Sequence, residues 1–154
     1  MFHLLKTLLG IVVLIFVFFF VRNWQVENSD QGKMFATSTA PTTKLDSFYK
    51  GGVALPIKVT WLGKKFDSKT QTGINVFDDG AGNQYDMYPF TTSVSTTSSS
   101  SALYIDYNLP ANPFWLRPIL DQLVQVAPGQ YLGKLTVRII PGFPFSLGFF
   151  KLQK

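Results

Sequence analysis

The sequence predicts a mostly β protein, with one amino-terminal transmembrane helix and then a seven- or eight-stranded antiparallel barrel that contains one short helix. Three observations lead to this fold class: the first twenty or so residues are almost wholly apolar, apolar and polar residues alternate along residues 45–154, and glycine-rich turns separate the alternating segments. Such alternation is typical of strands with one buried face, and closure into a barrel leaves few exposed strand edges.

Residues 1–24 are predicted to be an uncleaved transmembrane signal anchor. The 20-residue stretch from Phe2 to Val21 is long enough to cross a bilayer core of about 30 Å, and Lys6 can extend toward the headgroups. A cleaved secretory peptide would end in small residues, whereas nothing small follows Val21 until Ser29. The alternative is a buried helix of a soluble domain. The residues expected at the anchor and the membrane interface are Phe16, Phe18, Phe19, Phe20, Arg22 and Trp24.

Charge does not decide the orientation of the anchor, because Lys6 on one side faces Arg22 and Lys33 on the other. A short amino-terminal flank before a long polar domain favours export of that domain. We therefore expect a single-pass protein of the bacterial inner membrane with a periplasmic carboxy-terminal domain, and a cytosolic domain is the alternative.

Residues 25–44 are predicted to be a flexible tether between the anchor and the barrel. They are mostly polar, include Pro41 and show little apolar periodicity. Twenty flexible residues would span about 25 Å on average. The barrel domain could then lean on the membrane or on a neighbouring protein.

The barrel domain is predicted to cover residues 45–154, with its clearest alternation in residues 53–61, 103–109 and 134–139. Turns at Asp79-Gly80 and Pro141-Gly142 separate strands on either side. The side chains expected to face the barrel interior, or to line a ligand site there, are Leu55, Ile57, Val59, Trp61, Leu103, Ile105, Tyr107, Leu135, Val137 and Ile139.

The one short helix of the barrel domain is predicted to follow Pro118. Ile119, Leu120, Leu123 and Val124 fall on one helical stripe, and Pro128-Gly129 would end the helix. Such a helix could cap one end of the barrel.

Two segments, "WLGKKF" at 61–66 and "APGQYLGK" at 127–134, carry a resemblance to a known family. Together they resemble the lipocalin-like superfamily, especially small bacterial domains with a G-x-W-x-G motif, although Val59 stands at the first glycine. The resemblance implies a barrel in which Trp61 closes one end of the core. Independently of any family, Gly63 and Gly133 within strands indicate a bulge or a sharp bend more than a ligand contact.

No catalytic site, metal site or cofactor is predicted, and the chain is expected not to be an enzyme. It has no cysteine, its one histidine is His3, and its one glutamate is Glu27 in the predicted tether. Asp78, Asp79 and Asp86 surround a glycine-rich turn, but their spacing does not match a calcium-binding loop.

Two non-catalytic functions remain. The favoured one is an accessory subunit of a larger membrane protein assembly, because the predicted interior side chains are large enough to fill the barrel. The alternative is a membrane-tethered protein that binds a lipid or another small apolar ligand. The net charge of +5 is spread out and suits a membrane surface better than a nucleic acid, so no nucleic-acid partner is expected. Candidate contacts with a partner or the membrane are Phe114, Trp115, Leu116 and Arg117.

Overall fold

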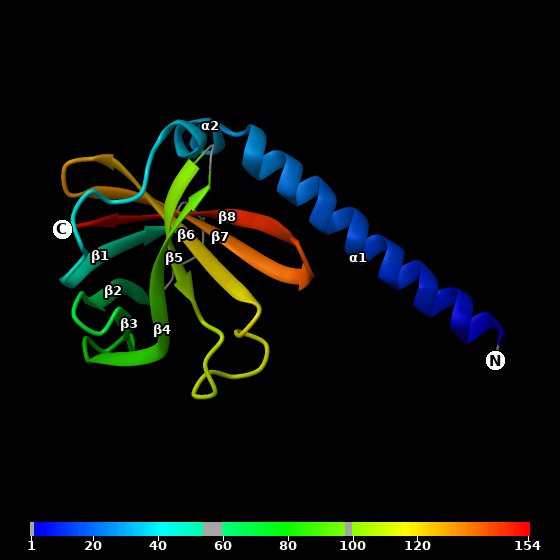
Figure 1. Cartoon of the computed structure of the whole chain (residues 1–154). Helices are drawn as coiled ribbons and strands as arrows, with labels where there is room; N and C mark the ends of the chain where they lie inside the picture. Colours follow the sequence, from blue (N-terminus) through cyan, green and yellow to red (C-terminus); the bar gives the residue numbers. More distant parts are fainter. Residues whose placement is uncertain (1, 54–59, 98–99) are drawn as a thin grey trace.

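The computed structural model describes residues 2–53, 60–97 and 100–154, which form one long helix and a β-barrel with a second, short helix on its wall (Figure 1). The helices are α1 (Phe2–Asn28) and α2 (Asp30–Thr37). The strands are β1 (Ser47–Val53), β2 (Trp61–Asp67), β3 (Thr72–Asp78), β4 (Gln84–Thr97), β5 (Ser100–Asp106), β6 (Ile119–Ala127), β7 (Gln130–Ile140) and β8 (Phe143–Gln153).

Within the described residues, eight strands close into a barrel in which each strand pairs antiparallel with the next along the chain. The barrel closes between β8 and β1, where the register runs from Lys50 opposite Gln153 to Val53 opposite Phe150. The predicted mostly β class and the closed antiparallel barrel are therefore confirmed, at the upper end of the predicted number of strands. Because the described strands close on themselves, their paired segments offer no free edge to which another strand could add.

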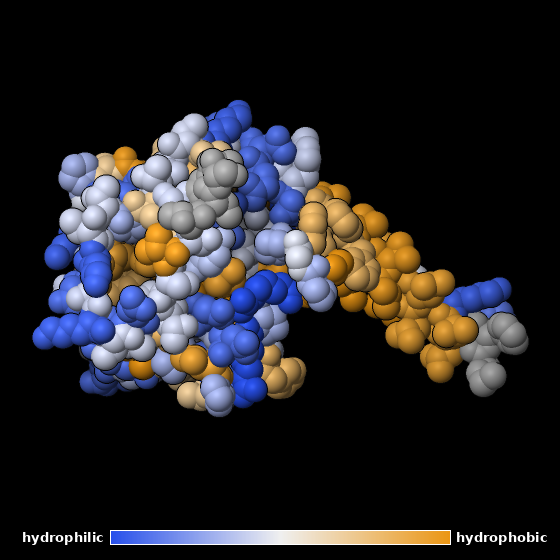
Figure 2. All heavy atoms as spheres, in the orientation of Figure 1, coloured by the Kyte–Doolittle hydropathy of each residue, from blue (hydrophilic) through white to orange (hydrophobic). Residues whose placement is uncertain are grey.

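Helix α1 extends away from the barrel and presents apolar side chains to its surroundings (Figure 2). Its segment His3–Asn28 is 26 residues long and apolar enough to cross a membrane. At 1.5 Å per residue this segment is about 39 Å long, more than the thickness of a hydrocarbon core. The helix thus has the length and composition that an anchor requires.

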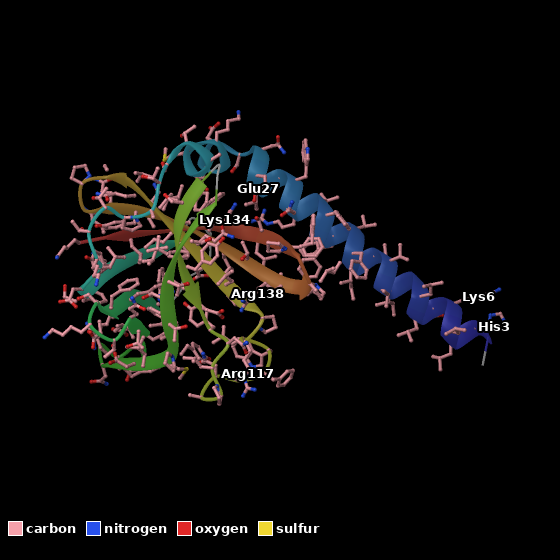
Figure 3. The ribbon with its side chains drawn as sticks, in the orientation of Figure 1. His3, Lys6, Glu27, Arg117, Lys134 and Arg138 are labelled. Atoms are coloured by element: carbon pink, nitrogen blue, oxygen red, sulfur yellow. The ribbon has the colours of Figure 1, made fainter. Side chains whose placement is uncertain are left out.

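The carboxy-terminal end of α1 packs against the outer wall of the barrel. The ring of Phe19 lies 5.4 Å from that of Phe145, and the ring of Phe20 lies 5.8 Å from that of Phe143. About two turns further along, Glu27 accepts a hydrogen bond from Lys134 at 3.0 Å (Figure 3). Aromatic packing and a charge-assisted hydrogen bond therefore fix the end of the helix to the β7–β8 hairpin.

Residues 25–44 contain more regular structure than the predicted flexible tether. Helix α1 continues to Asn28, and Ser29 then caps α2 by accepting a hydrogen bond from the Gly32 amide at 3.0 Å. Phe35 of α2 packs on the outside of the barrel with Val124 and Leu132. The prediction of a flexible tether is wrong for this part, because one serine cap and one buried phenylalanine order a segment whose composition is otherwise polar.

The segment Ile119–Ala127 forms strand β6, so the prediction of a helix after Pro118 is wrong. Leu123 lies in the interior cluster, whereas Val124 lies under α2 on the outer face. A strand that is buried on both faces places apolar residues next to each other and can imitate a helical stripe. The short second helix of the fold is α2.

A core of large side chains fills one end of the barrel. Its aromatic rings meet edge to face, as between Tyr49 and Tyr131 at 5.5 Å and between Phe66 and Phe90 at 5.3 Å. The buried members of this core are Leu45, Tyr49, Phe66, Phe90, Ile105, Tyr107, Leu123, Tyr131, Phe150 and Leu152.

Candidate functional site

Three strands lose their regular register around the other end of the barrel. One residue is inserted at Leu62 of β2 relative to β3, one at Tyr88 of β4 relative to β3, and one at Leu147 of β8 relative to β7. Tyr88 also has a left-handed backbone, with φ at 61°. Bulges and strained residues are common at barrel rims and next to binding sites, where they redirect side chains.

The bulge in β2 requires the glycine at position 63. Gly63 has a φ of +146°, and a Cβ atom there would lie 2.0 Å from the backbone oxygen of Tyr49. Because the bulge adds one residue after Trp61, the side chain that next turns into the barrel is Lys64 and not Gly63. A buried cation in the barrel interior follows from this single insertion.

Lys64 lies at the centre of a buried polar cluster with Asp121, Asn75, Tyr107 and Trp61. The Lys64 ammonium lies 3.1 Å from a carboxylate oxygen of Asp121, and both residues are 2% exposed. It also donates to the side-chain oxygen of Asn75 at 2.9 Å and to the Tyr107 hydroxyl. Trp61 donates to the same Asn75 oxygen at 3.1 Å, and the Tyr107 hydroxyl donates to Asp121 at 3.2 Å.

Burial dominates the electrostatics of the Lys64–Asp121 pair. Burial lowers the pKa of Lys64, and the neighbouring carboxylate of Asp121 opposes that change. Burial likewise raises the pKa of Asp121, and Lys64 opposes that change. The pKa of Tyr107 lies well above its usual range because its hydroxyl is buried beside the Asp121 carboxylate.

Aromatic rings surround the ammonium of Lys64 on several sides. It lies between 5.0 and 5.5 Å from the ring centres of Tyr107, Phe150, Phe90 and Trp61. These rings attract a cation and replace part of its lost hydration. The three donors of the ammonium already reach Asp121, Asn75 and Tyr107, so the cluster satisfies its own cation.

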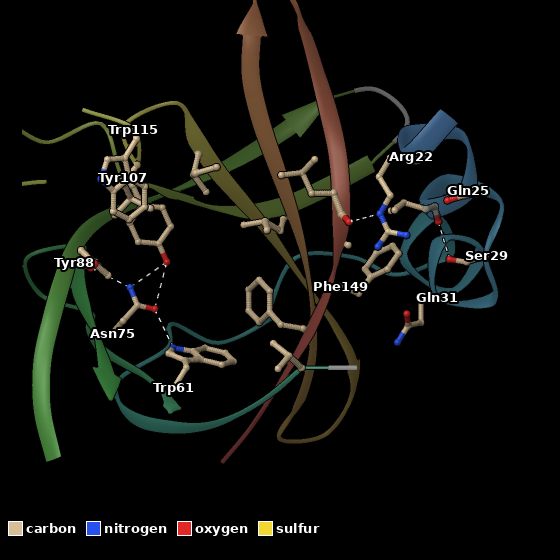
Figure 4. A pocket seen from close by; sticks show the side chains of 18 of the residues that line it. Arg22, Gln25, Ser29, Gln31, Trp61, Asn75, Tyr88, Tyr107, Trp115 and Phe149 are labelled. Atoms are coloured by element: carbon tan, nitrogen blue, oxygen red, sulfur yellow. Dashed lines mark hydrogen bonds between the residues drawn. The ribbon is translucent and has the colours of Figure 1, made fainter. Parts of the chain in front are cut away.

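A cavity of about 560 Å³ lies between this polar cluster and the end of α1 (Figure 4). Trp61, Asn75 and Tyr107 of the cluster form part of its wall, and most of the remaining wall is apolar. The other described residues that line it are Arg22, Gln25, Val26, Ser29, Gln31, Val53, Phe77, Tyr88, Trp115, Leu116, Ile119, Leu135, Leu147, Gly148, Phe149 and Phe150.

Among the described residues that line the cavity, the charged one lies on its helical side. Arg22 donates from Nε to the backbone oxygen of Leu147 at 2.8 Å, and its terminal nitrogen lies 3.5 Å from where a Cβ of Gly148 would stand. The carbonyl of Leu147 belongs to the residue inserted in β8, so the bulge provides the acceptor that fixes Arg22. Figure 4 shows this arginine next to strand β8, on the other side of β7 and β8 from Trp61 and Tyr107 in this view.

The predicted interior residues differ in where the structure places them. Ile105 and Tyr107 lie in the buried core, and Leu103 and Trp61 pack against it while partly exposed. Leu135 lines the cavity and Val137 is buried. Ile139 is 48% exposed, so its predicted interior position is wrong, because β7 extends past the end of the core there. Leu55, Ile57 and Val59 lie outside the described residues.

The predicted anchor and contact residues divide between the barrel wall and the surroundings. Phe16 is half-buried, Phe19 and Phe20 contact the β7–β8 hairpin, and Phe18 and Trp24 are exposed. In the loop between β5 and β6, Phe114 is 81% exposed and Trp115 is 56% exposed. Leu116 lines the cavity, and Arg117 donates to the backbone oxygens of Asn112 and Pro110 and so holds the loop closed.

Sequence reasoning missed the polar cluster and the helical rim of the cavity. Lys64 and Asn75 had no predicted role, and Asp121 lay in the segment predicted as a helix. The sequence shows each of these three residues as a polar side chain within a strand. A strict alternation of buried and exposed positions would place such a side chain on the solvent face. Asp78 and Asp79 accept hydrogen bonds from backbone amides of their own turn, and these contacts are exposed to solvent.

Comparisons with known proteins support the fold and no more. No family model matches the chain, and no curated protein matches it. Among solved structures, the chain is similar to a crystal structure of a protein from Thermomonospora curvata, with 16% sequence identity and a TM-score of 0.57. The match covers 79% of this chain and 83% of that chain. The likeness therefore extends over most of both molecules and concerns the barrel architecture.

Proposed function

We propose that this protein is a membrane-anchored barrel that binds one apolar ligand from the lipid phase in the cavity between its interior and α1. The observation that carries the proposal is the cavity itself, which at about 560 Å³ and with a mostly apolar wall resembles a small-molecule site. We further propose that the barrel lies on the exported side of a bacterial inner membrane and belongs to the lipocalin-like domains that its Trp61 segment resembles.

The arrangement of the interior favours ligand binding over a purely structural barrel. Core side chains pack closely around Tyr49 and Phe66, whereas the described side chains around Trp61 and Leu135 leave the cavity between them. A barrel built only as a rigid support would gain dispersion energy from filling that space. The cavity also lies next to α1, from which a membrane lipid would approach.

Filling the cavity should weaken binding of an acyl probe. We expect Leu135→Trp to weaken binding of cis-parinaric acid to the full chain in non-ionic detergent by at least tenfold, because the new indole occupies the space that the acyl chain needs. Binding is read as energy transfer from tryptophan, with Trp24→Phe as the common background so that the signal comes from Trp61 and Trp115, which line the cavity.

The matched control is Ile139→Trp, which adds the same side chain on the same strand at an exposed position. It should leave probe affinity within about twofold of the background variant, a difference well under 1 kcal/mol. Equal affinity of the Leu135→Trp and Ile139→Trp chains, or no saturable binding to the background variant, would contradict the proposed function.

A second candidate function is docking on a larger membrane protein, and the exposed loop before β6 favours it. Phe114 and Trp115 expose large apolar side chains to solvent, although a hydrogen bond from Arg117 to Asn112 fixes their loop. Ordered exposed aromatic residues are typical of contact sites. We expect gentle-detergent purification from the native host to recover a stoichiometric partner, and Phe114→Ser/Trp115→Ser to reduce that recovery severalfold. Recovery of a lone monomer would argue against this second function.

A further inference from the structure

We propose that the ligand is a single-chain amphiphile with an anionic head, and that Arg22 binds this head while the chain enters the barrel. The inference rests on the proposed function, because it names the chemical class that the same cavity accepts. Four observations about the cavity carry it.

The first observation concerns the donors of Arg22. A guanidinium carries five N–H donors, and in the described part of the chain only Nε of Arg22 has a hydrogen-bond partner, the oxygen of Leu147. The two terminal nitrogens therefore have no carboxylate and no carbonyl among the described residues. A half-buried arginine with two adjacent free nitrogens presents the fork that binds a carboxylate or a phosphate with paired hydrogen bonds.

The second observation concerns charge. Of the described residues that line the cavity, Arg22 is the charged one, and its neighbours Gln25, Ser29 and Gln31 are neutral. The nearby Glu27 accepts hydrogen bonds from Lys134 and Ser146 on the outer wall. The helical rim thus combines one cation with neutral amide and hydroxyl groups, which favours an anionic head over a neutral or cationic one.

The third observation shows why the head does not bind deeper. The donors of Lys64 and Trp61 already reach acceptors within the polar cluster, and the amide of Asn75 donates to the Tyr107 hydroxyl and to the backbone oxygen of Tyr88. Among the described residues, the group of this cluster that lacks a partner is one oxygen of Asp121, which as a carboxylate would repel an anion. The inner end of the cavity, which Trp61 and Leu116 help to line, is therefore suited to the hydrocarbon tail.

The fourth observation concerns depth in a membrane. Arg22 is the first charged residue after the apolar stretch, and it follows Lys6 by 16 residues or about 24 Å of helix. In a helix that spans a bilayer, Lys6 and Arg22 would therefore lie near opposite boundaries of a hydrocarbon core of about 30 Å. Anionic heads of membrane amphiphiles lie at the same level.

The test compares three ligands with one tail: oleate, oleoyl lysophosphatidate and oleyl alcohol. Each displaces cis-parinaric acid from the full chain in non-ionic detergent at pH 8. We expect both anions to bind at least tenfold more tightly than the alcohol, because a hydrogen bond to a charged group contributes that much affinity. Arg22→Gln should remove this difference while the affinity for the alcohol changes less than threefold, and Arg22→Lys should restore part of it.

The matched control is Lys33→Gln, which removes one positive charge from the exposed face of α2 outside the cavity wall. It should preserve the preference for anions and so excludes a general effect of net charge. Equal binding of acid and alcohol to the native chain would overturn the role of Arg22 and leave the proposed function intact. Failure of every ligand to displace the probe would instead overturn the proposed function. The native comparison decides the inference even where Arg22→Gln fails to fold.

Discussion

Replacement of Asp121 by alanine is expected to lower the free energy of unfolding by about 3–5 kcal/mol. The change leaves the Lys64 ammonium in the barrel interior without the carboxylate that lies 3.1 Å away. Asn75 and the surrounding rings still contact the ammonium, but they carry no net negative charge. An uncompensated buried charge costs more than the ion pair itself contributes, because water no longer solvates it.

The measurement is urea unfolding of the full chain in non-ionic detergent, followed by tryptophan fluorescence. Asp86→Ala is the matched control, because Asp86 pairs with Lys65, the next residue of β2, at 2.9 Å on the exposed face. Loss of an exposed pair should cost less than about 1 kcal/mol. The double variant Lys64→Met/Asp121→Leu should recover most of the stability lost in Asp121→Ala. Equal costs for Asp121→Ala and Asp86→Ala would show that the buried pair has no special role.

The fold was predictable where one physical signal dominated. The apolar stretch up to Val21 predicted a helix long enough for a membrane, and alternation in residues 103–109 and 134–139 predicted strands. Antiparallel closure followed from the number of short strands. The prediction failed for β6, where burial on both faces brings Leu123 and Val124 together and imitates a helical stripe.

The candidate site was mostly not predictable, because it depends on irregularities of register. The sequence shows Gly63 within a strand but not the direction in which the following lysine then faces. The acceptor for Arg22 exists because β8 carries an inserted residue at Leu147, which breaks no sequence pattern. Arg22 itself was predicted at the membrane interface, and its place on the cavity wall depends on how α1 docks on the barrel.

The buried pair and the cavity have complementary roles. The Lys64–Asp121 ion pair links strands β2 and β6 inside the barrel, next to the cavity wall that Trp61, Asn75 and Tyr107 form. Large aromatic side chains there close the inner wall of the cavity without filling it. A substitution in the pair should therefore change stability first and ligand affinity only as a consequence, whereas a substitution of Arg22 should change ligand affinity first.

Lys64→Met should produce a stability loss that shrinks as the solution becomes more acidic. At neutral pH the variant leaves the Asp121 carboxylate buried without its cation and should lose about 3–5 kcal/mol of unfolding free energy. Burial already raises the pKa of Asp121, and Lys64 is the main opposing influence. Removing Lys64 therefore raises the pKa of this carboxyl further.

An aspartate in the unfolded chain titrates at a pH of about 4. Between that pH and the raised pKa of Asp121, the folded variant therefore binds a proton that the unfolded chain lacks. Its free energy of unfolding should therefore increase as the pH falls through the raised pKa, relative to the native chain, and stop increasing below about 4. Urea unfolding between pH 7.5 and 4 measures this difference. Lys65→Met removes the neighbouring exposed cation, and its smaller cost should stay nearly constant over the range. A stability difference between Lys64→Met and the native chain that does not change with pH would show that Asp121 stays charged without Lys64.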